Sequence, residues 1–254
     1  MNGYAAFLRK EWMEIRRTWR IWVIPGMLVF FGLTSPILAL VTPSLISSLA
    51  GSQPGMTITL PPPTPFDAGA QFLKSLNQMV IFALILGGAG SISGERATGT
   101  AVLAVTKPVS RSALVMAKLT ADLLLLAGST LVATLLSGVV TAALFDKVAW
   151  RPLLFAVGLW LAFAILVTSA MSLFSVWFRS RGAAAGAGLA FFFVTLLAAI
   201  WPPAARYSFI GLSSQTGTAL AGGMVAWPWS VGTALLGSCL FAIVSVKAFE
   251  RQEL

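Results

Sequence analysis

The sequence predicts an all-α, polytopic membrane protein with six transmembrane helices, an N-terminal amphipathic helix and a short helix between the second and third spans. Hydrophobic residues make up 57% of the 254 residues and charged residues only 10%, whereas soluble domains are about 25% charged. Six apolar runs reach the ~20 residues that a helix needs to cross a hydrocarbon core. Tryptophans stand at the expected ends of these runs, where membrane helices meet water.

Residues 4–22 are expected to form the amphipathic helix. Apolar side chains recur there at steps of three and four residues, and basic and acidic side chains fill the opposite face. Such a helix lies in the plane of the lipid headgroups. A membrane anchor is one interpretation, and an elbow helix that also contacts a partner is the other. The apolar face consists of Tyr4, Leu8, Trp12, Ile15, Trp19 and Trp22, and the polar face of Arg9, Lys10, Glu14, Arg16, Arg17 and Arg20.

The six spans form a single domain over residues 1–254. Trp160 is the one tryptophan expected deep inside a span, where it can pack between helices. The spans are expected near Ile21–Ile46, Phe72–Ser93, Leu119–Phe145, Pro152–Phe178, Ala183–Trp201 and Trp227–Phe249.

Two loops stand out between the spans. The first, Ser47–Ala70, contains the run Leu60–Pro65, which predicts a stiff polyproline II segment, and Asp67 is expected to cap the helix that follows. The second, Pro202–Ala226, is apolar but broken by Pro and Gly. It predicts a pair of short re-entrant pieces packed on protein.

The distribution of Lys and Arg predicts the orientation. With the N-terminus inside, thirteen of the 17 basic residues lie on the cytoplasmic side and four outside, and this positive-inside bias is typical of membrane proteins. An even number of spans then places both termini in the cytoplasm, in a plasma membrane. The four outside residues are Lys74, Lys147, Arg151 and Arg206.

The composition argues against several classes of function. The chain contains no His, so imidazole metal ligands and Ser-His nucleophile pairs are excluded. Its one cysteine, Cys239, cannot form an intrachain disulfide and is expected to be a small packed hydrophobe. The net charge of +9 lies in short segments beside apolar runs, which indicates contact with an anionic leaflet and not with nucleic acid.

A charged, turn-bearing segment separates the second and third spans and must lie at a membrane surface. Residues Glu95–Val105 can form a short helix, and Lys107 precedes Pro108, which disfavours helix in the residue before it. Ser110 is expected to cap the third span, which begins at about Arg111. One interpretation is a solvated loop whose charges only set topology, and the other is a docking stub for a partner.

The same segment has the spacing of a phosphate-binding loop without its chemistry. Gly94 and Gly99 are followed by Thr100 and Ala101, so the Lys that meets the phosphates and the Ser or Thr after it are both absent. The chain is therefore not expected to hydrolyse ATP, nor to hold a cofactor.

Two groups of polar residues fall inside the spans. Lys118 and Asp122 are four residues apart and are expected to form an interfacial ion pair, with a proton or ion site as the alternative. Gln71, Ser75 and Gln78 share a helix face with Lys74. That face predicts either a substrate path at an external vestibule or an interhelical hydrogen-bond seam.

The fifth span opens with Gly182 and Gly186 at small-xxx-small spacing, followed by Gly188. This pattern predicts close helix packing, with a dimer interface as a further interpretation.

The segment that begins Ser93-Gly94-Glu95-Arg96 and ends in Pro108-Val109-Ser110-Arg111 resembles the type-2 family of ATP-binding-cassette (ABC) permeases, which are mostly exporters. In that family the equivalent segment is a cytoplasmic coupling helix that docks onto a separate ATPase subunit. The resemblance covers about 30 residues closely and the whole chain in layout.

The resemblance implies roles for the segment. Glu95 and Arg96 would pair with charged groups of the ATPase, Gly99 and Thr100 would allow close approach, and Pro108–Arg111 would set the turn. ATP and Mg would be bound by the partner subunit, the membrane part would be a dimer of this chain or of this chain with a related permease, and the amphipathic helix would be the elbow. The absence of charged pore residues favours export of an apolar or amphiphilic cargo.

Two other classes of function compete with this interpretation. An ion- or proton-coupled carrier would need several buried ionisable groups, and only Asp122 is clearly inside a span. An intramembrane enzyme would need His or an acidic dyad, and the chain offers neither.

Overall fold

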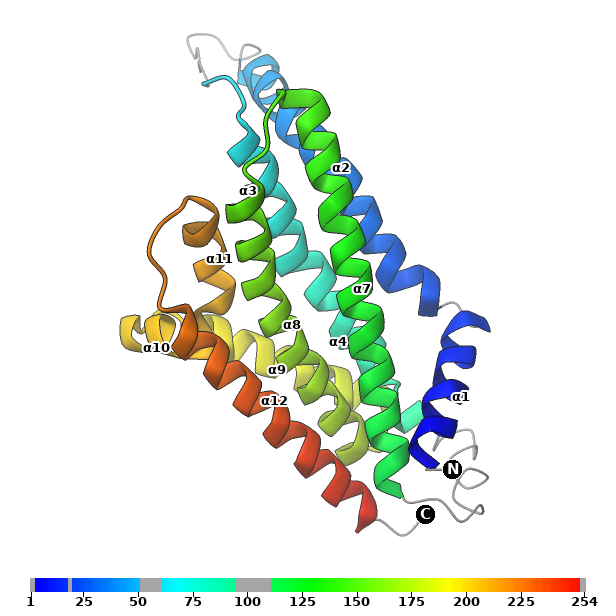
Figure 1. Cartoon of the computed structure of the whole chain (residues 1–254). Coiled ribbons are helices and arrows are strands. Elements are labelled where there is room, and N and C mark those ends of the chain that lie inside the picture. The colour runs from blue at the N-terminus through cyan, green and yellow to red at the C-terminus, as the bar shows by residue number, and fades with distance from the viewer. Residues whose placement is uncertain (1–2, 18–19, 51–60, 95–110, 252–254) are drawn as a thin grey trace.

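The computed structural model describes residues 3–17, 20–50, 61–94 and 111–251, and the regular secondary structure in these ranges is helical. Six helices are long and apolar enough to cross a membrane, which confirms the predicted number of spans. Figure 1 shows α1, the start of α7 and the end of α12 at one end of the bundle, called the base here. The end of α2, the start of α3 and the turn between α7 and α8 lie at the opposite, far end.

The long helices follow the expected runs closely, and the shorter helices lie between them. The helices are α1 Gly3–Arg17, α2 Arg20–Ala50, α3 Pro65–Ser75, α4 Ile81–Ala89, α7 Arg111–Phe145, α8 Trp150–Trp177, α9 Arg181–Ala198, α10 Pro202–Tyr207, α11 Leu212–Leu220 and α12 Trp227–Glu250. A π-helical turn, Leu76–Val80, joins α3 to α4, and a 3-10 turn, Phe209–Gly211, joins α10 to α11.

The second span begins at Pro65 and not near Phe72 as expected. Thr64 is the N-cap: its hydroxyl accepts from the Asp67 amide, and the Asp67 carboxylate accepts from the Thr64 amide at 2.8 Å. Asp67 is therefore the third residue of a capping box and not the cap itself. This reciprocal pair satisfies two backbone donors at the helix start, which extends the helix seven residues outward. The helix of the third span begins at Arg111, as expected, and so starts several residues before the apolar run near Leu119.

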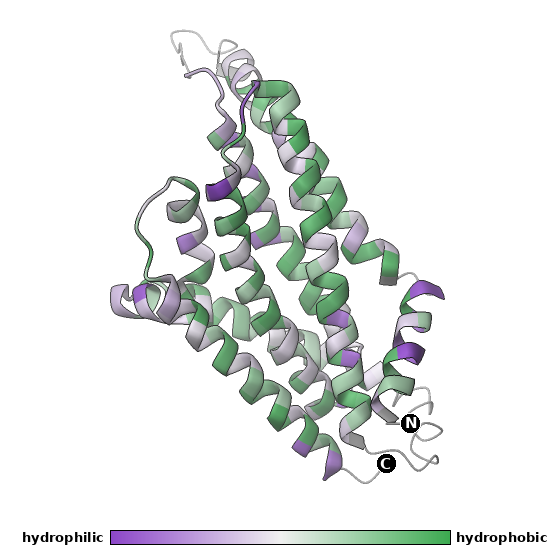
Figure 2. Cartoon of the chain, in the orientation of Figure 1, coloured by the Kyte–Doolittle hydropathy of each residue, from purple (hydrophilic) through white to green (hydrophobic). Residues whose placement is uncertain are grey.

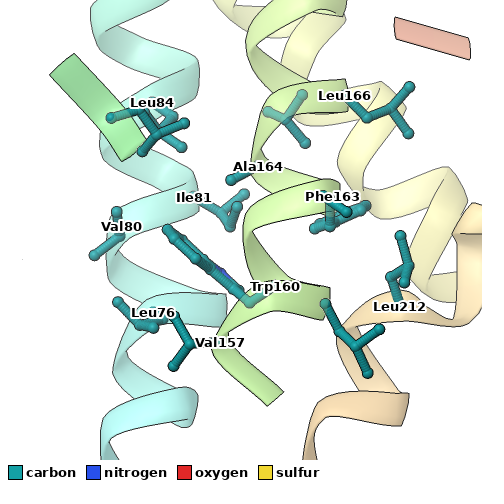
Figure 3. Packing of buried hydrophobic residues seen from close by; sticks show 14 of the residues in the cluster. Leu76, Val80, Ile81, Leu84, Val157, Trp160, Phe163, Ala164, Leu166 and Leu212 are labelled. Atoms are coloured by element: carbon teal, nitrogen blue, oxygen red, sulfur yellow. The ribbon is translucent and has the colours of Figure 1, made fainter. Parts of the chain in front are cut away.

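Helix α8 forms the centre of the bundle. Of the 18 most apolar consecutive residues of α8, 67% are buried, whereas the same measure is 22–50% in the other five spans. Trp160 is fully buried, as expected, and its ring lies between α8 and the α3–α4 span (Figure 3). Leu76, Val80 and Ile81 approach it from that span. The large indole ring thus fills the space between the two helices, as in other closely packed protein interiors.

Helices α2 and α7 approach each other closely at Gly32. A Cβ atom built at Gly32 would lie 2.6 Å from the Ala133 carbonyl oxygen. Since real Cβ atoms do not come that near a backbone oxygen, only glycine allows this approach.

The stretch between α9 and α12 forms short helices packed on protein, as expected. Gln215 of α11 donates from Nε2 to the Ala205 carbonyl at 2.7 Å and to the Ser230 hydroxyl at 2.9 Å. These bonds connect α11 to α10 and α12, and they satisfy the Ala205 carbonyl and the Ser230 hydroxyl.

Figure 2 shows hydrophobic residues along most of the length of the long helices and hydrophilic residues on α1. A helix begins where the amphipathic helix was expected, but it ends at Arg17. Trp19 lies outside the described residues, and Arg20 and Trp22 belong to α2. Ile15 is buried and packs with Leu8 against Ala121 and Leu125 of α7. Trp12 is 42% exposed, so not every member of the expected apolar face meets protein.

Candidate functional site

The expected docking segment follows Gly94 in the sequence and precedes α7, whose first residues lie at the base (Figure 1). Glu95, Arg96, Gly99, Thr100, Pro108 and Ser110 lie outside the described residues. Arg111 is the first residue of α7. What the structure describes is the support on either side of the segment: the turn Gly90–Gly94 and the first turns of α7.

Ser175 of α8 holds the turn that leads into the segment. Its hydroxyl oxygen accepts from the amides of Ile92 at 2.8 Å and Ser93 at 3.1 Å, and it donates to the Ala89 carbonyl at 3.2 Å. All three contacts are buried. One side chain of α8 thus completes the backbone hydrogen bonding at the end of α4, where helix termini leave groups unsatisfied.

Arg181, the first residue of α9, lies against the same turn. A Cβ atom at Gly94 would be 2.6 Å from Arg181 Nη2, and one at Gly90 would be 3.3 Å from Arg181 Cδ. The two glycines therefore leave room for a guanidinium group directly before Glu95. A positive charge next to the segment would favour a carboxylate there or on a partner.

An apolar cluster joins both sides of the segment. Ile92 from the turn packs with Leu114 and Val115 of α7, and Val176 of α8 and Phe249 of α12 complete the cluster. Phe7 of α1 packs against the same group. The elements on either side of the segment therefore share one small core.

A buried ion pair connects α1 to α7 beside this core. Lys118 Nζ lies 2.9 Å from Glu11 Oε2, and the two side chains are only 3% and 1% exposed. Lys10 Nζ lies 3.1 Å from Glu11 Oε1 and 3.0 Å from Glu14. Burial raises the pKa of Glu11, but the attraction and hydrogen bonds of Lys118 and Lys10 outweigh it, so the pKa is lowered from 4.5.

Glu11 was not among the residues singled out from the sequence. It stands between Lys10 and Trp12, at the boundary between the polar and apolar faces. The signal that could have found it is its position on the Leu8–Ile15 side of the helix, where an acid needs a partner. The pairing expected for Lys118 was with Asp122, and that pair stays a prediction.

The three residues expected along a substrate path do not share one environment. Gln71 borders a cavity, Ser75 is buried with its hydroxyl oxygen 3.4 Å from that of Ser35 on α2, and Gln78 is exposed. The π-helical turn over Leu76–Val80 lies among them. Its wider turn shifts the residues after it around the helix axis, which separates Gln78 from the face of Gln71 and Ser75.

The cavity lies between α2 and α3 at the far end, with a volume of about 340 Å³. Asp67, Gln71 and Lys74 border it from α3, and Ala39, Pro43 and Ile46 border it from α2. The sequence predicted either a vestibule or a hydrogen-bond seam at Gln71. It did not indicate the α2 wall, because that contact depends on how the two helices pack.

Asn77 is a further polar contact that the sequence did not indicate. Its Nδ2 donates to the Leu73 carbonyl at 3.0 Å and to the Thr216 hydroxyl at 3.3 Å, which joins the second span to α11.

The glycines of α9 divide into two groups. A Cβ at Gly188 would lie 2.3 Å from Met171 Sδ, so Gly188 packs closely on α8, as expected. Cβ atoms at Gly182 and Gly186 would meet nothing within 4 Å, so the expected close packing within the chain does not occur at these two. Their place in a dimer interface stays a prediction.

In the described part of the chain, no three His, Cys, Asp or Glu side chains gather where they could hold a metal ion.

Comparison with known proteins gives two findings. The model of a family described as ABC-2 family transporter protein matches residues 5–209. The chain is also similar to the uncharacterized transmembrane protein YxlG of Bacillus subtilis (strain 168), with 25% identity over 256 residues, covering 100% of this chain and 99% of that protein.

Proposed function

Because the chain belongs to the ABC-2 family of transporter proteins, we propose that it is the permease subunit of an exporter whose ATP is hydrolysed by a separate subunit. The family identity makes the chain a multi-pass membrane protein and the permease component of a transporter. The sequence has no phosphate-binding loop. In this proposal ATP and Mg²⁺ are therefore bound by a partner ATPase subunit.

The observation that carries this proposal is the support of the segment between Gly94 and Arg111. The turn before it is tied to α8 through Ser175, and α7, which begins at Arg111, is tied to α1 through Lys118 and Glu11. A partner that pushes on Glu95–Ser110 would therefore move several spans together. These contacts on both sides of the segment favour a coupling element over a loop that only sets topology.

In this proposal α1 is the elbow helix. Its ion pair with Lys118 lies about two helical turns from the start of α7, since seven residues rise ~10.5 Å. A displaced α7 would thus carry α1 with it along the membrane surface. The base faces the cytoplasm, and both termini lie there, which the positive-inside bias supports.

The proposed cargo is apolar or amphiphilic. Among the described residues of the spans, the buried charged side chain is Lys118, near the base, and the other buried polar side chains are Ser and Thr hydroxyls. Spans of this kind offer no strong field for a small ion.

Co-purification tests the proposal. The chain is expressed with the ATPase encoded by a neighbouring gene, and Glu95→Ala and Arg111→Ala variants are compared with Lys147→Ala at the far end. Loss of a key contact at the centre of an interface costs more than about 1 kcal/mol, so we expect each base variant to weaken complex formation about fivefold or more.

The far-end variant should retain the ATPase at the level of the unchanged chain. If neither Glu95→Ala nor Arg111→Ala weakens the complex or its ATP-coupled transport, the coupling role of the segment is wrong.

A further inference from the structure

The cavity at the far end has one polar and one apolar wall. Asp67, Gln71 and Lys74 are spaced i, i+4 and i+7, so they lie on one face of α3. Ala39, Thr42, Pro43 and Ile46 of α2 face them, and the Thr42 hydroxyl donates to the Leu38 carbonyl of its own helix. Pro61 and Pro63 border the cavity from the segment before α3. Its volume of about 340 Å³ falls in the ~300–1,000 Å³ range of ligand pockets.

Lys74 requires an explanation at this position. It stands nine residues after the start of a span that begins at Pro65, which places its Cα about 14 Å along the helix. A charged side chain at such a position normally faces water or pairs with an opposite charge. Lys74 is exposed and makes no ion pair within the described residues. A bound anionic group would provide the missing partner.

Asp67 argues against a purely anionic ligand. Its carboxylate lies on the same wall, and both described hydrogen bonds to it, from the Thr64 amide and hydroxyl, reach Oδ2. An acid at one end of the wall repels a second negative charge and attracts a positive one. The wall therefore presents a cation and an anion to the same space.

The spacing of the two charges suits a small zwitterion. Seven residues separate the Cα atoms by ~10.5 Å, and helical side chains lean toward the N-terminus, so the Lys74 ammonium points toward Gln71 and Asp67. No ion pair joins Asp67 to Lys74 in the described chain, which leaves room between them for one headgroup.

The α2 wall determines the rest of the ligand. Alanine, proline and isoleucine side chains bind alkyl groups by the hydrophobic effect, at roughly 25 cal/mol per Å² of apolar surface buried. This wall lies on a membrane span, where a lipid's acyl chain can reach it without leaving the bilayer.

We propose that this cavity binds a zwitterionic phospholipid, with the phosphate on Lys74 and Gln71, the ammonium on Asp67, and the acyl chains along Ala39, Pro43 and Ile46. The proposal names a lipid as a ligand of the far end. Binding itself does not depend on coupling to an ATPase; only a role for the lipid as cargo rests on the proposed function.

Native mass spectrometry of the full detergent-purified chain tests the proposal with phosphatidylethanolamine, phosphatidylcholine, phosphatidylglycerol, diacylglycerol and soluble phosphoethanolamine. We expect the two zwitterionic lipids to bind at least about tenfold more tightly than the other three. Lys74→Met and Asp67→Asn should each reduce that binding about tenfold. Asn keeps an oxygen for the Thr64 amide, so the helix cap is retained.

Lys147→Met removes a cation at the same end of the bundle but outside the cavity, and it should leave binding unchanged. Equal binding of phosphatidylglycerol, equal binding of soluble phosphoethanolamine, or binding that survives Lys74→Met would each overturn the proposal. Melting temperatures in lipid-free detergent, unchanged between variants, show that a loss of binding is not a loss of folding. ATPase stimulation by the lipid is measured separately, so failure of coupling is distinguished from failure of binding.

Discussion

At the scale of single residues, Ser175 has the largest share in the hydrogen bonding of the base. Ser175→Ala leaves the Ile92 and Ser93 amides without the acceptor that now binds both. Burying an unsatisfied donor costs about 1–3 kcal/mol, so we expect a lower melting temperature in detergent.

Ser169→Ala is the matched control for this change. Ser169 is also buried on α8, but its hydroxyl donates only to the Ile165 carbonyl of its own helix, at 2.9 Å. An equal loss of stability in both variants would contradict the role assigned to Ser175.

The ion pair of Glu11 and Lys118 predicts a second residue-scale effect. Glu11→Gln and Lys118→Met each remove one charge of this buried pair, and breaking such a pair typically costs about 3–5 kcal/mol. The double variant removes both charges and should recover much of that loss. Thermal unfolding of the three variants measures the effect, and additive losses would show that the pair is not coupled.

The pH dependence of stability follows from the same residue. The pKa of Glu11 is lowered in the folded protein from its ordinary 4.5, so the unfolded chain binds the proton more readily. The contribution of Glu11 is therefore complete above about pH 4.5 and is lost as the pH falls through the lower folded pKa. Melting temperatures measured from pH 6 down to pH 3 should fall less steeply in Glu11→Gln, and an unchanged slope would contradict the assignment.

At the scale of elements, the approach of α2 to α7 depends on Gly32. Gly32→Ala would force a Cβ to within 2.6 Å of the Ala133 carbonyl oxygen, and overpacking of this kind typically costs about 1–3 kcal/mol. Gly26→Ala on the same helix meets nothing within 4 Å and should be neutral or slightly stabilising, since Ala favours helix. Melting temperatures of the two variants test this, and equal values would contradict the packing argument.

At the scale of the whole molecule, the positive-inside bias predicts which face of the membrane holds each loop. Cys239 is the free cysteine and is exposed, so it is first replaced in a Cys239→Ser background. Thr98→Cys should then react with a membrane-impermeant maleimide only from the cytoplasmic side, and Ser52→Cys only from the outside. Labelling of Thr98→Cys in intact cells would show the opposite topology, and it would contradict the docking proposal as well.

Composition and spacing were sufficient for the fold class, the number of spans and the short helices of Pro202–Ala226. These follow from local rules, because every backbone polar group in lipid must be satisfied inside its own segment. Features that depend on the residues of one segment alone could therefore be predicted from the sequence. The length of the second span was underestimated, since the Thr64–Asp67 capping box lies in a stretch of mixed polarity.

Contacts between segments could not be predicted in the same way. Glu11 meets Lys118 across 107 positions, and Ser175 meets Ile92 across 83. Nothing in either local pattern specifies the partner, since hydrogen bonds and buried charges depend on how the helices pack. The sequence by itself thus determined six apolar helices, and it predicts the side of the membrane on which their charges lie. Only the tertiary structure decided which polar groups meet at the base and which apolar wall faces Lys74, because those distances are set by helix packing and not by spacing along the chain.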